Sequence, residues 1–277
     1  MELNNYDKIV ELYHAMKDNE ELLKVFYAND YPVPYKTLTL YPVQVDLYYY
    51  FHLLVQCLLL PHKTSGDIKA ISLSYLKYLY YLATEKGQPE AIASLGELLL
   101  IVLRKPKTYK DKNGNEKFSI SFELDKGLID IEGEKFDSKD FDIIKKIILE
   151  QNAIEEPDET IPPELLKAYK ELEEYKLKQS KVKMCSFEDQ INVIVARSSY
   201  RRDEVMKMTI RSFSRLLDRV DKILSYEINS LLKPYMDKKD AEKVEHYMQD
   251  TDKTLKERCN AAFTDMDSLH KKVEGQI

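Results

Sequence analysis

The chain has 277 residues, of which 44% are hydrophobic and 32% are charged, and this length accommodates one large or two small domains with a true hydrophobic core. A formal net charge of −6 disfavours a protein that coats nucleic acid, because such proteins usually present an overall basic surface. The seven glycines are few, which argues against a loop-rich fold with glycine-lined phosphate sites.

Residues 1–105 predict a cluster of helices, because apolar residues recur every three or four positions along most of this stretch. The proline-bearing segment at 31–42 interrupts the pattern, since the residue before each proline favours extended backbone. Pro42 suits the first position of the helix that follows, and Asp67 suits the cap of the next. Four helices are expected, at residues 4–28, 42–60 and 67–85 and after Pro89.

Residues 106–136 change from a helical to an alternating pattern of apolar and polar residues, which is typical of a half-buried strand. Asn113-Gly114 is a strong hairpin signal. We expect a small three-stranded antiparallel β-meander here, packed on a neighbouring helix because so small a sheet is not stable alone. An insertion is favoured over a protruding contact element. The alternating apolar residues are Phe118, Ile120, Phe122 and Leu124.

The second half of the chain returns to a helical pattern. Residues 137–151 predict one helix, and the acidic, proline-bearing segment at 152–163 is the most natural linker. Residues 164–277 then predict a C-terminal helical domain. Two short helices are expected in its tail, near residues 240–248 and from residue 250 or 251.

Within that domain, residues 186–232 predict two short helices that lead into one long helix. Ser186 can cap the first, Ser198 or Ser199 the second, and Thr209 the third. The fold class is therefore mainly α, with an N-terminal helical cluster, a β-meander insertion and a C-terminal domain that contains a helix-turn-helix-like triplet. Six of the eight arginines fall in this stretch: Arg197, Arg201, Arg202, Arg211, Arg215 and Arg219.

Arg211, Arg215 and Arg219 follow one another at four-residue spacing on the long helix, about opposite its apolar stripe. They predict an outward ridge of guanidinium groups. A solvated face is the favoured interpretation, followed by an acidic protein partner and then by nucleic acid. Arg201 and Arg202 occupy the helix that reads bases in helix-turn-helix proteins.

No sequence motif indicates catalysis, a metal or a cofactor. The phosphate-binding patterns GxxxxGK[ST] and GxGxxG and the nucleophile pattern GxSxG are missing. The three cysteines are far apart and odd in number, which favours a reducing, cytoplasmic compartment over a disulfide framework. Neither a signal peptide nor a membrane span is expected. We therefore expect a protein without enzymatic activity.

Several sequence segments resemble those of proteins encoded in the tail-gene region of tailed bacteriophages of Gram-positive bacteria. They are LYPVQVDLYYYF at 40–51, ISLSYLKYL at 71–79, FDIIKKIILEQN at 141–152 and the segment at 184–228. The last is similar to the small helical domain of tail-assembly chaperones, where a short helix precedes a helix with a recurrent apolar motif. The residues that match this motif are Met208, Thr209, Ile210, Phe213, Leu216 and Leu217.

The resemblance implies a phage assembly protein that binds other phage proteins, such as the tape-measure protein, in the bacterial cytoplasm. A structural component of the virion (tail, baseplate or connector) and a nucleic-acid-binding regulator are the alternatives, and a homo-oligomer is compatible with each. Such a chaperone needs an exposed apolar or tyrosine-rich surface. The candidate partner-binding residues are Arg201, Arg202, Arg211, Arg215, Arg219, Tyr48, Tyr49, Tyr78 and Tyr81.

Overall fold

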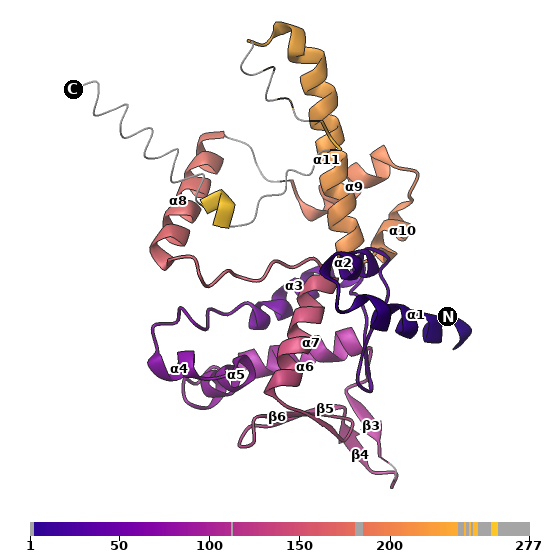
Figure 1. Ribbon diagram of the computed structural model, residues 1–277, viewed down its shortest axis with the longest axis vertical. Coiled ribbons are helices and arrows are strands. Elements are labelled where there is room, and N and C mark those ends of the chain that lie inside the picture. Colours follow the sequence, from indigo (N-terminus) through magenta and orange to yellow (C-terminus); the bar gives the residue numbers. More distant parts are fainter. Residues whose placement is uncertain are drawn as a thin grey trace, which may run out of the picture. The chain divides into compact units, whose positions relative to one another are not determined.

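The computed structural model describes residues 3–111, 113–180, 185–237, 241, 244, 246–248 and 256–259 (Figure 1). It is 60% helical with small antiparallel sheets, which confirms a mainly α fold with a small β insertion. None of the described helices is both long and apolar enough to cross a membrane. Of the first expected tail helix, residue 241 is helical, but residues 244 and 246–248 are described and are not helical. Residues 256–259 of the second are helical, and its other residues lie outside the described part of the chain.

The chain forms two compact units that are not continuous in sequence. Unit 1 comprises Met1–Glu156 and Ile194–Leu217, and unit 2 comprises Pro157–Val193 and Asp218–Ile277. The division into consecutive domains that the sequence suggests remains a prediction. The two compact units do not show whether each of those segments folds on its own.

The N-terminal part of unit 1 contains more and shorter helices than the four expected. Asn19 interrupts the first, since its side chain accepts hydrogen bonds from the backbone N–H groups of Glu21 and Leu22 and so caps a new helix. Leu73 and Ser74 adopt extended backbone and break the third. The helices are α1 (Leu3–Met16), α2 (Glu20–Ala28), α3 (Tyr48–Val55), α4 (Ile68–Ser72), α5 (Tyr75–Thr84) and α6 (Glu90–Leu103), with 3₁₀ turns at Val45–Leu47 and Gln56–Leu58.

The core of unit 1 gathers around α6, whose Leu95, Leu98 and Leu99 are fully inaccessible to solvent. Helix α5 buries its tyrosines and directs their hydroxyl groups to polar partners, which is how a tyrosine is buried without loss of a hydrogen bond. Tyr80, for example, donates to the carbonyl of Leu128 at 2.7 Å. Asp67 caps α4, as the sequence predicts.

The β region contains a three-stranded antiparallel meander and, in addition, a separate two-stranded hairpin. The hairpin at Asn113-Gly114 is confirmed, but the expected strand through Phe118 and Phe122 breaks at Ser119. The backbone N–H of Ser119 donates to the carbonyl of Lys107, and its own carbonyl accepts from Glu132, so this residue joins both sheets. Antiparallel pairs connect β3 (Thr108–Lys110) with β4 (Glu116–Phe118), and β5 (Ile120–Glu123) with β6 (Leu128–Ile131) and then β7 (Glu134–Phe136). A separate hairpin pairs β1 (Val33–Tyr35) with β2 (Leu38–Leu40).

The helices of the second half follow the expected order. Asp137 caps α7 (Ser138–Gln151) and forms a capping box with Asp140. The other helices are α8 (Pro163–Ser180), α9 (Phe187–Arg197), α10 (Arg202–Lys207) and α11 (Ile210–Leu232). A 3₁₀ turn at Lys233–Tyr235, which contains Pro234, follows α11.

The prediction that Ser198 or Ser199 caps the second of the three helices in residues 186–232 is wrong. Ser198 donates its hydroxyl hydrogen back to the carbonyl of Ile194. Instead, the Glu204 carboxylate accepts from the backbone N–H of Arg201 at 2.7 Å at the start of α10. Ser186 does accept from the backbone N–H of Asp189, so the first cap is confirmed.

The start of α11 is fixed within unit 1 by backbone pairing with the segment that follows Pro42. The N–H of Val45 donates to the carbonyl of Met208 at 2.9 Å, and the N–H of Ile210 donates to the carbonyl of Val43 at 2.8 Å. This pairing keeps the segment after Pro42 extended, so the helical turn begins only at Val45 and the expected role of Pro42 as first helical residue is wrong.

Candidate functional site

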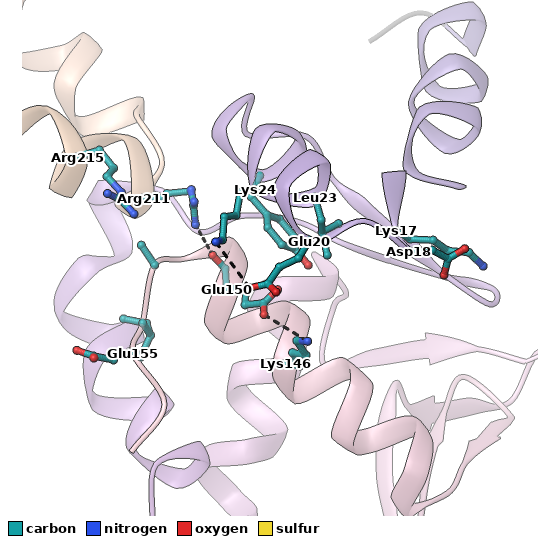
Figure 2. A pocket seen from close by; sticks show the side chains of 13 residues that line it. Lys17, Asp18, Glu20, Leu23, Lys24, Lys146, Glu150, Glu155, Arg211 and Arg215 are labelled. Atoms are coloured by element: carbon teal, nitrogen blue, oxygen red, sulfur yellow. Dashed lines mark hydrogen bonds and ion pairs between the residues drawn. The ribbon is translucent and has the colours of Figure 1, made fainter. Parts of the chain in front are cut away.

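The beginning of α11, the end of α7 and the α1–α2 region surround a hollow of about 510 Å³ within unit 1 (Figure 2). We call it the arginine hollow. The lining residues are Lys17, Asp18, Glu20, Leu23, Lys24, Tyr27, Lys146, Glu150, Ala153, Ile154, Glu155, Arg211 and Arg215.

Arg211 lies half-buried at the end of α7. Its Nη1 donates to the backbone carbonyl of Glu150 at 2.6 Å, and its guanidinium lies 5.8 Å from the ring centroid of Tyr27. The last carbonyls of a helix carry partial negative charge, so this cation stabilises the end of α7. Burial, and then the positive charge of Arg215, lower the pKa of Arg211 from its ordinary value.

The carboxylates nearest to these residues have partners of their own. The Glu150 carboxylate hydrogen-bonds to the Tyr27 hydroxyl and pairs with Lys146 at 3.6 Å. Burial, and then the charge of Glu150, raise the pKa of Tyr27. Glu20 pairs with Lys24 at 3.7 Å. The negative charges of Asp30 and Glu150 act favourably on Arg211, although its hydrogen bond goes to the Glu150 carbonyl.

A second depression of about 610 Å³ lies between α6 and the strands β4 and β5, and we call it the apolar groove. Phe118 is 72% exposed on its edge and Leu124 is 40% exposed. A Cβ atom on Gly96 would lie 3.4 Å from the ring of Phe122, so the ring packs directly on the helix backbone. The lining residues are Ala83, Thr84, Pro89, Ile92, Ala93, Gly96, Glu97, Leu100, Lys107, Phe118, Ile120, Phe122 and Leu124.

The charged groups of the apolar groove pair with each other. Lys107 Nζ lies 2.7 Å from Glu97 Oε1, and this contact holds the pKa of Glu97 below its ordinary value. The Tyr50 hydroxyl also donates to Glu97 at 3.2 Å. Apolar side chains therefore dominate the rest of the surface.

The structure separates the arginines expected to form one outward ridge. Arg211 and Arg215 line the arginine hollow, and only Arg215 is exposed, so the outward placement of Arg211 is wrong. Arg219 lies in unit 2, where it donates to the carbonyl of Tyr247. The exposed Arg201 pairs with Asp203 at 3.2 Å and Glu204 at 3.8 Å, and Arg202 is exposed beside it.

The structure also divides the candidate tyrosines. Tyr78 and Tyr81 are only 5% and 8% exposed, so both belong to the core and are removed from the candidate contact surface. Tyr48 is half-buried with its ring 6.5 Å from that of Phe213. Tyr49 is 69% exposed and stays a candidate.

The alternating pattern of residues 118–124 indicates the apolar side chains of the groove but predicts that all of them lie in the interior. The alternation at Phe118, Ile120, Phe122 and Leu124 gives their common face, and Ile120 and Phe122 do pack against the core. Phe118 does not, because the break at Ser119 moves it to the edge of the groove.

Comparison with known proteins finds one similarity. No curated protein and no solved structure matches the chain. Residues 176–252, which include the arginine-rich helices, match the family model of the YomV second domain. YomV is a Bacillus phage protein, so this similarity supports a phage protein.

Proposed function

We propose that the protein is a non-enzymatic phage assembly protein that binds other phage proteins in the host cytoplasm. In its most specific form, the proposal is a tail-assembly chaperone that holds an apolar helical segment of the tape-measure protein. The family match in residues 176–252 supports the phage origin, and the apolar groove carries the proposed mode of action.

The exposed Phe118 is the central observation. Large apolar side chains gathered at a surface depression mark interaction sites, and aromatic anchors contribute much of the binding energy at protein interfaces. The groove has the size of a binding pocket, so the apolar side chains along one face of a partner helix can enter it.

A polypeptide suits this groove better than a small molecule does. Small-molecule sites combine an apolar wall with convergent polar groups that fix the orientation of the ligand. Here Glu97 and Lys107 already satisfy each other, and the opposite wall consists of Ile120, Phe122 and Leu124. The groove therefore offers contact area with little polar selectivity, as an assembly chaperone requires.

The test compares Phe118→Asp with Ile68→Asp in a tagged chain purified from phage-infected cells. Both residues are exposed, Ile68 by 86%, but only Phe118 lines the groove. Phage proteins that co-purify, identified by mass spectrometry, should be lost with Phe118→Asp and retained with Ile68→Asp. If both variants retain the same phage proteins, the groove is not the binding surface.

A second measurement separates a chaperone from a structural component. A chaperone leaves its client before the particle is complete, so purified virions should lack the protein. Its presence in virions at a fixed ratio to tail proteins would favour the structural alternative.

A further inference from the structure

Helix α3 presents large apolar side chains to solvent along one side. Leu53 is 69% exposed, and the exposed Tyr50 lies one helical turn before it, so the two share a face. The other side of the helix is well packed, since Phe51, Leu54 and Val55 are buried in the core of unit 1. The exposed face is therefore a feature of a firmly held helix, and neighbouring apolar side chains of this kind mark interaction surfaces.

This face is continuous with the apolar groove. The Tyr50 hydroxyl donates to Glu97 Oε2 at 3.2 Å, and Glu97 is one of the residues that line the groove. Its other oxygen, Oε1, lies 2.7 Å from Lys107 Nζ, so each oxygen of the carboxylate has a partner. A polypeptide that crosses from the groove to α3 thus passes over a neutralised pair of charges. We call the groove together with Tyr50 and Leu53 the extended groove.

An acidic side chain marks the α3 end of this surface. Asp46 is exposed in the 3₁₀ turn before α3, one turn ahead of Tyr50. Within the part of the chain that the structure describes, its carboxylate makes no ion pair. Because Glu97 and Lys107 neutralise each other, the charge left at the extended groove is negative. Charge complementarity therefore favours a partner with a basic residue at this end.

We propose that the extended groove binds one long amphipathic helix of a partner polypeptide, with its apolar stripe on Phe118 and Leu53 and a lysine or arginine beside Asp46. This inference rests on the proposed function, which places a partner helix in the groove, and it adds the length and the charge of that helix. A helix of about 18 residues is roughly 27 Å long, which exceeds the reach of a pocket of about 610 Å³. Its apolar residues recur every three or four positions, so one face can contact both the groove and α3.

The test measures binding of a fluorescent helical peptide of about 18 residues, with leucines along one face and lysines at one end, to the full chain by anisotropy at low salt. Leu53→Asp should weaken binding by about ten-fold, because a charge replaces a large apolar contact. Phe118→Asp should weaken it by at least as much. The matched control is Val25→Asp, since Val25 is 52% exposed within the short helix α2 of unit 1 but lies outside the extended groove.

The charge of the partner is tested at Asp46. Replacing the terminal lysines of the peptide by glutamates should weaken its binding to the wild-type chain by about three-fold, as expected for an exposed ion pair. The same replacement should have little effect on binding to Asp46→Asn. An equal effect on both chains would overturn the contact between a basic residue and Asp46.

The variants also separate this inference from the proposed function. Circular dichroism verifies that each variant folds, as the exposure of the substituted side chains predicts. Weaker binding by Phe118→Asp but not by Leu53→Asp would overturn the extended groove and leave the groove itself as the binding surface. Equal weakening by Val25→Asp, or no binding by the wild-type chain, would overturn the inference, whereas co-purification of phage proteins still tests the proposed function.

Discussion

Arg211 and Arg215 carry the same charge on the same helix, but because Arg211 is half-buried and Arg215 is exposed, they should contribute differently to the free energy of unfolding. Arg211→Ala should lower the free energy of unfolding by about 1–3 kcal/mol, because the carbonyl of Glu150 loses a charged donor at the end of α7. Arg215→Ala, at an exposed position, should change it by less than about 0.5 kcal/mol. Urea unfolding of the two variants measures the difference, and equal effects would contradict the structural role of Arg211.

Asp67 provides a pH-dependent contribution to stability. Its Oδ2 accepts from the Tyr81 hydroxyl at 2.6 Å and pairs with Lys86 at 3.0 Å, and these contacts hold the pKa of the carboxyl below its ordinary value. A lowered pKa stabilises the folded state above the pKa of the unfolded chain, about 4, and this stabilisation is lost as pH falls below it. Asp67→Ala should therefore lower the melting temperature at pH 7 and lower it progressively less as the pH falls below about 4.

Asp125 supplies the control for that experiment. It lies exposed in the turn between β5 and β6, and no ion pair of its carboxylate occurs in the described structure. Asp125→Ala should change the melting temperature little at either pH. A Tyr81→Phe variant should reproduce part of the Asp67→Ala effect, because it removes one of the two contacts that lower the pKa.

At the scale of elements, the sequence pattern predicted which segments are helical but not where they break. The apolar spacing of residues 4–28 continues through Asn19, so only the capping hydrogen bonds of its side chain reveal the break. Ser119 interrupts an alternating strand because its backbone hydrogen-bonds to Lys107 and Glu132, which are distant from the strand's own pattern of side chains. Arg211 is likewise half-buried because it contacts the end of α7. The spacing of apolar residues along α11 cannot predict that α7 lies there.

Alanine substitutions at Gly66, in a turn, and at Gly96, within a helix, should have opposite effects on stability. Gly96 lies within α6, where alanine is favoured by about 1 kcal/mol, and its new Cβ would meet the Phe122 ring at an ordinary 3.4 Å. Gly96→Ala should therefore raise the melting temperature. Gly66 has a φ of +74° in the turn before α4, so Gly66→Ala should lower it despite open space around the site. A loss of stability in Gly96→Ala would mean that the Phe122 ring is held more tightly than this contact indicates.

At the scale of the whole molecule, unit 1 depends on a segment far away in sequence. Val205, Ile210 and Phe213 are almost completely buried, and the pairing of Val43–Val45 with Met208–Ile210 supplies backbone hydrogen bonds that residues 1–156 alone lack. The Asp30 carboxylate also accepts from the Thr209 and Ser212 hydroxyls, each at 2.6 Å. A chain truncated after Glu156 should thus lose roughly 3 kcal/mol or more relative to one truncated after Leu217, since it lacks a fully buried phenylalanine and isoleucine.

Urea unfolding followed by circular dichroism measures that loss in the two truncated chains. A synthetic peptide spanning residues 186–232, added in excess, should restore part of the stability of the shorter chain, because binding to the folded state alone stabilises it. A variant peptide with Phe213→Ser should restore less, since Phe213 fills a buried position. Equal unfolding midpoints for the two truncations would mean that residues 1–156 fold alone and that the beginning of α11 merely attaches to a finished domain.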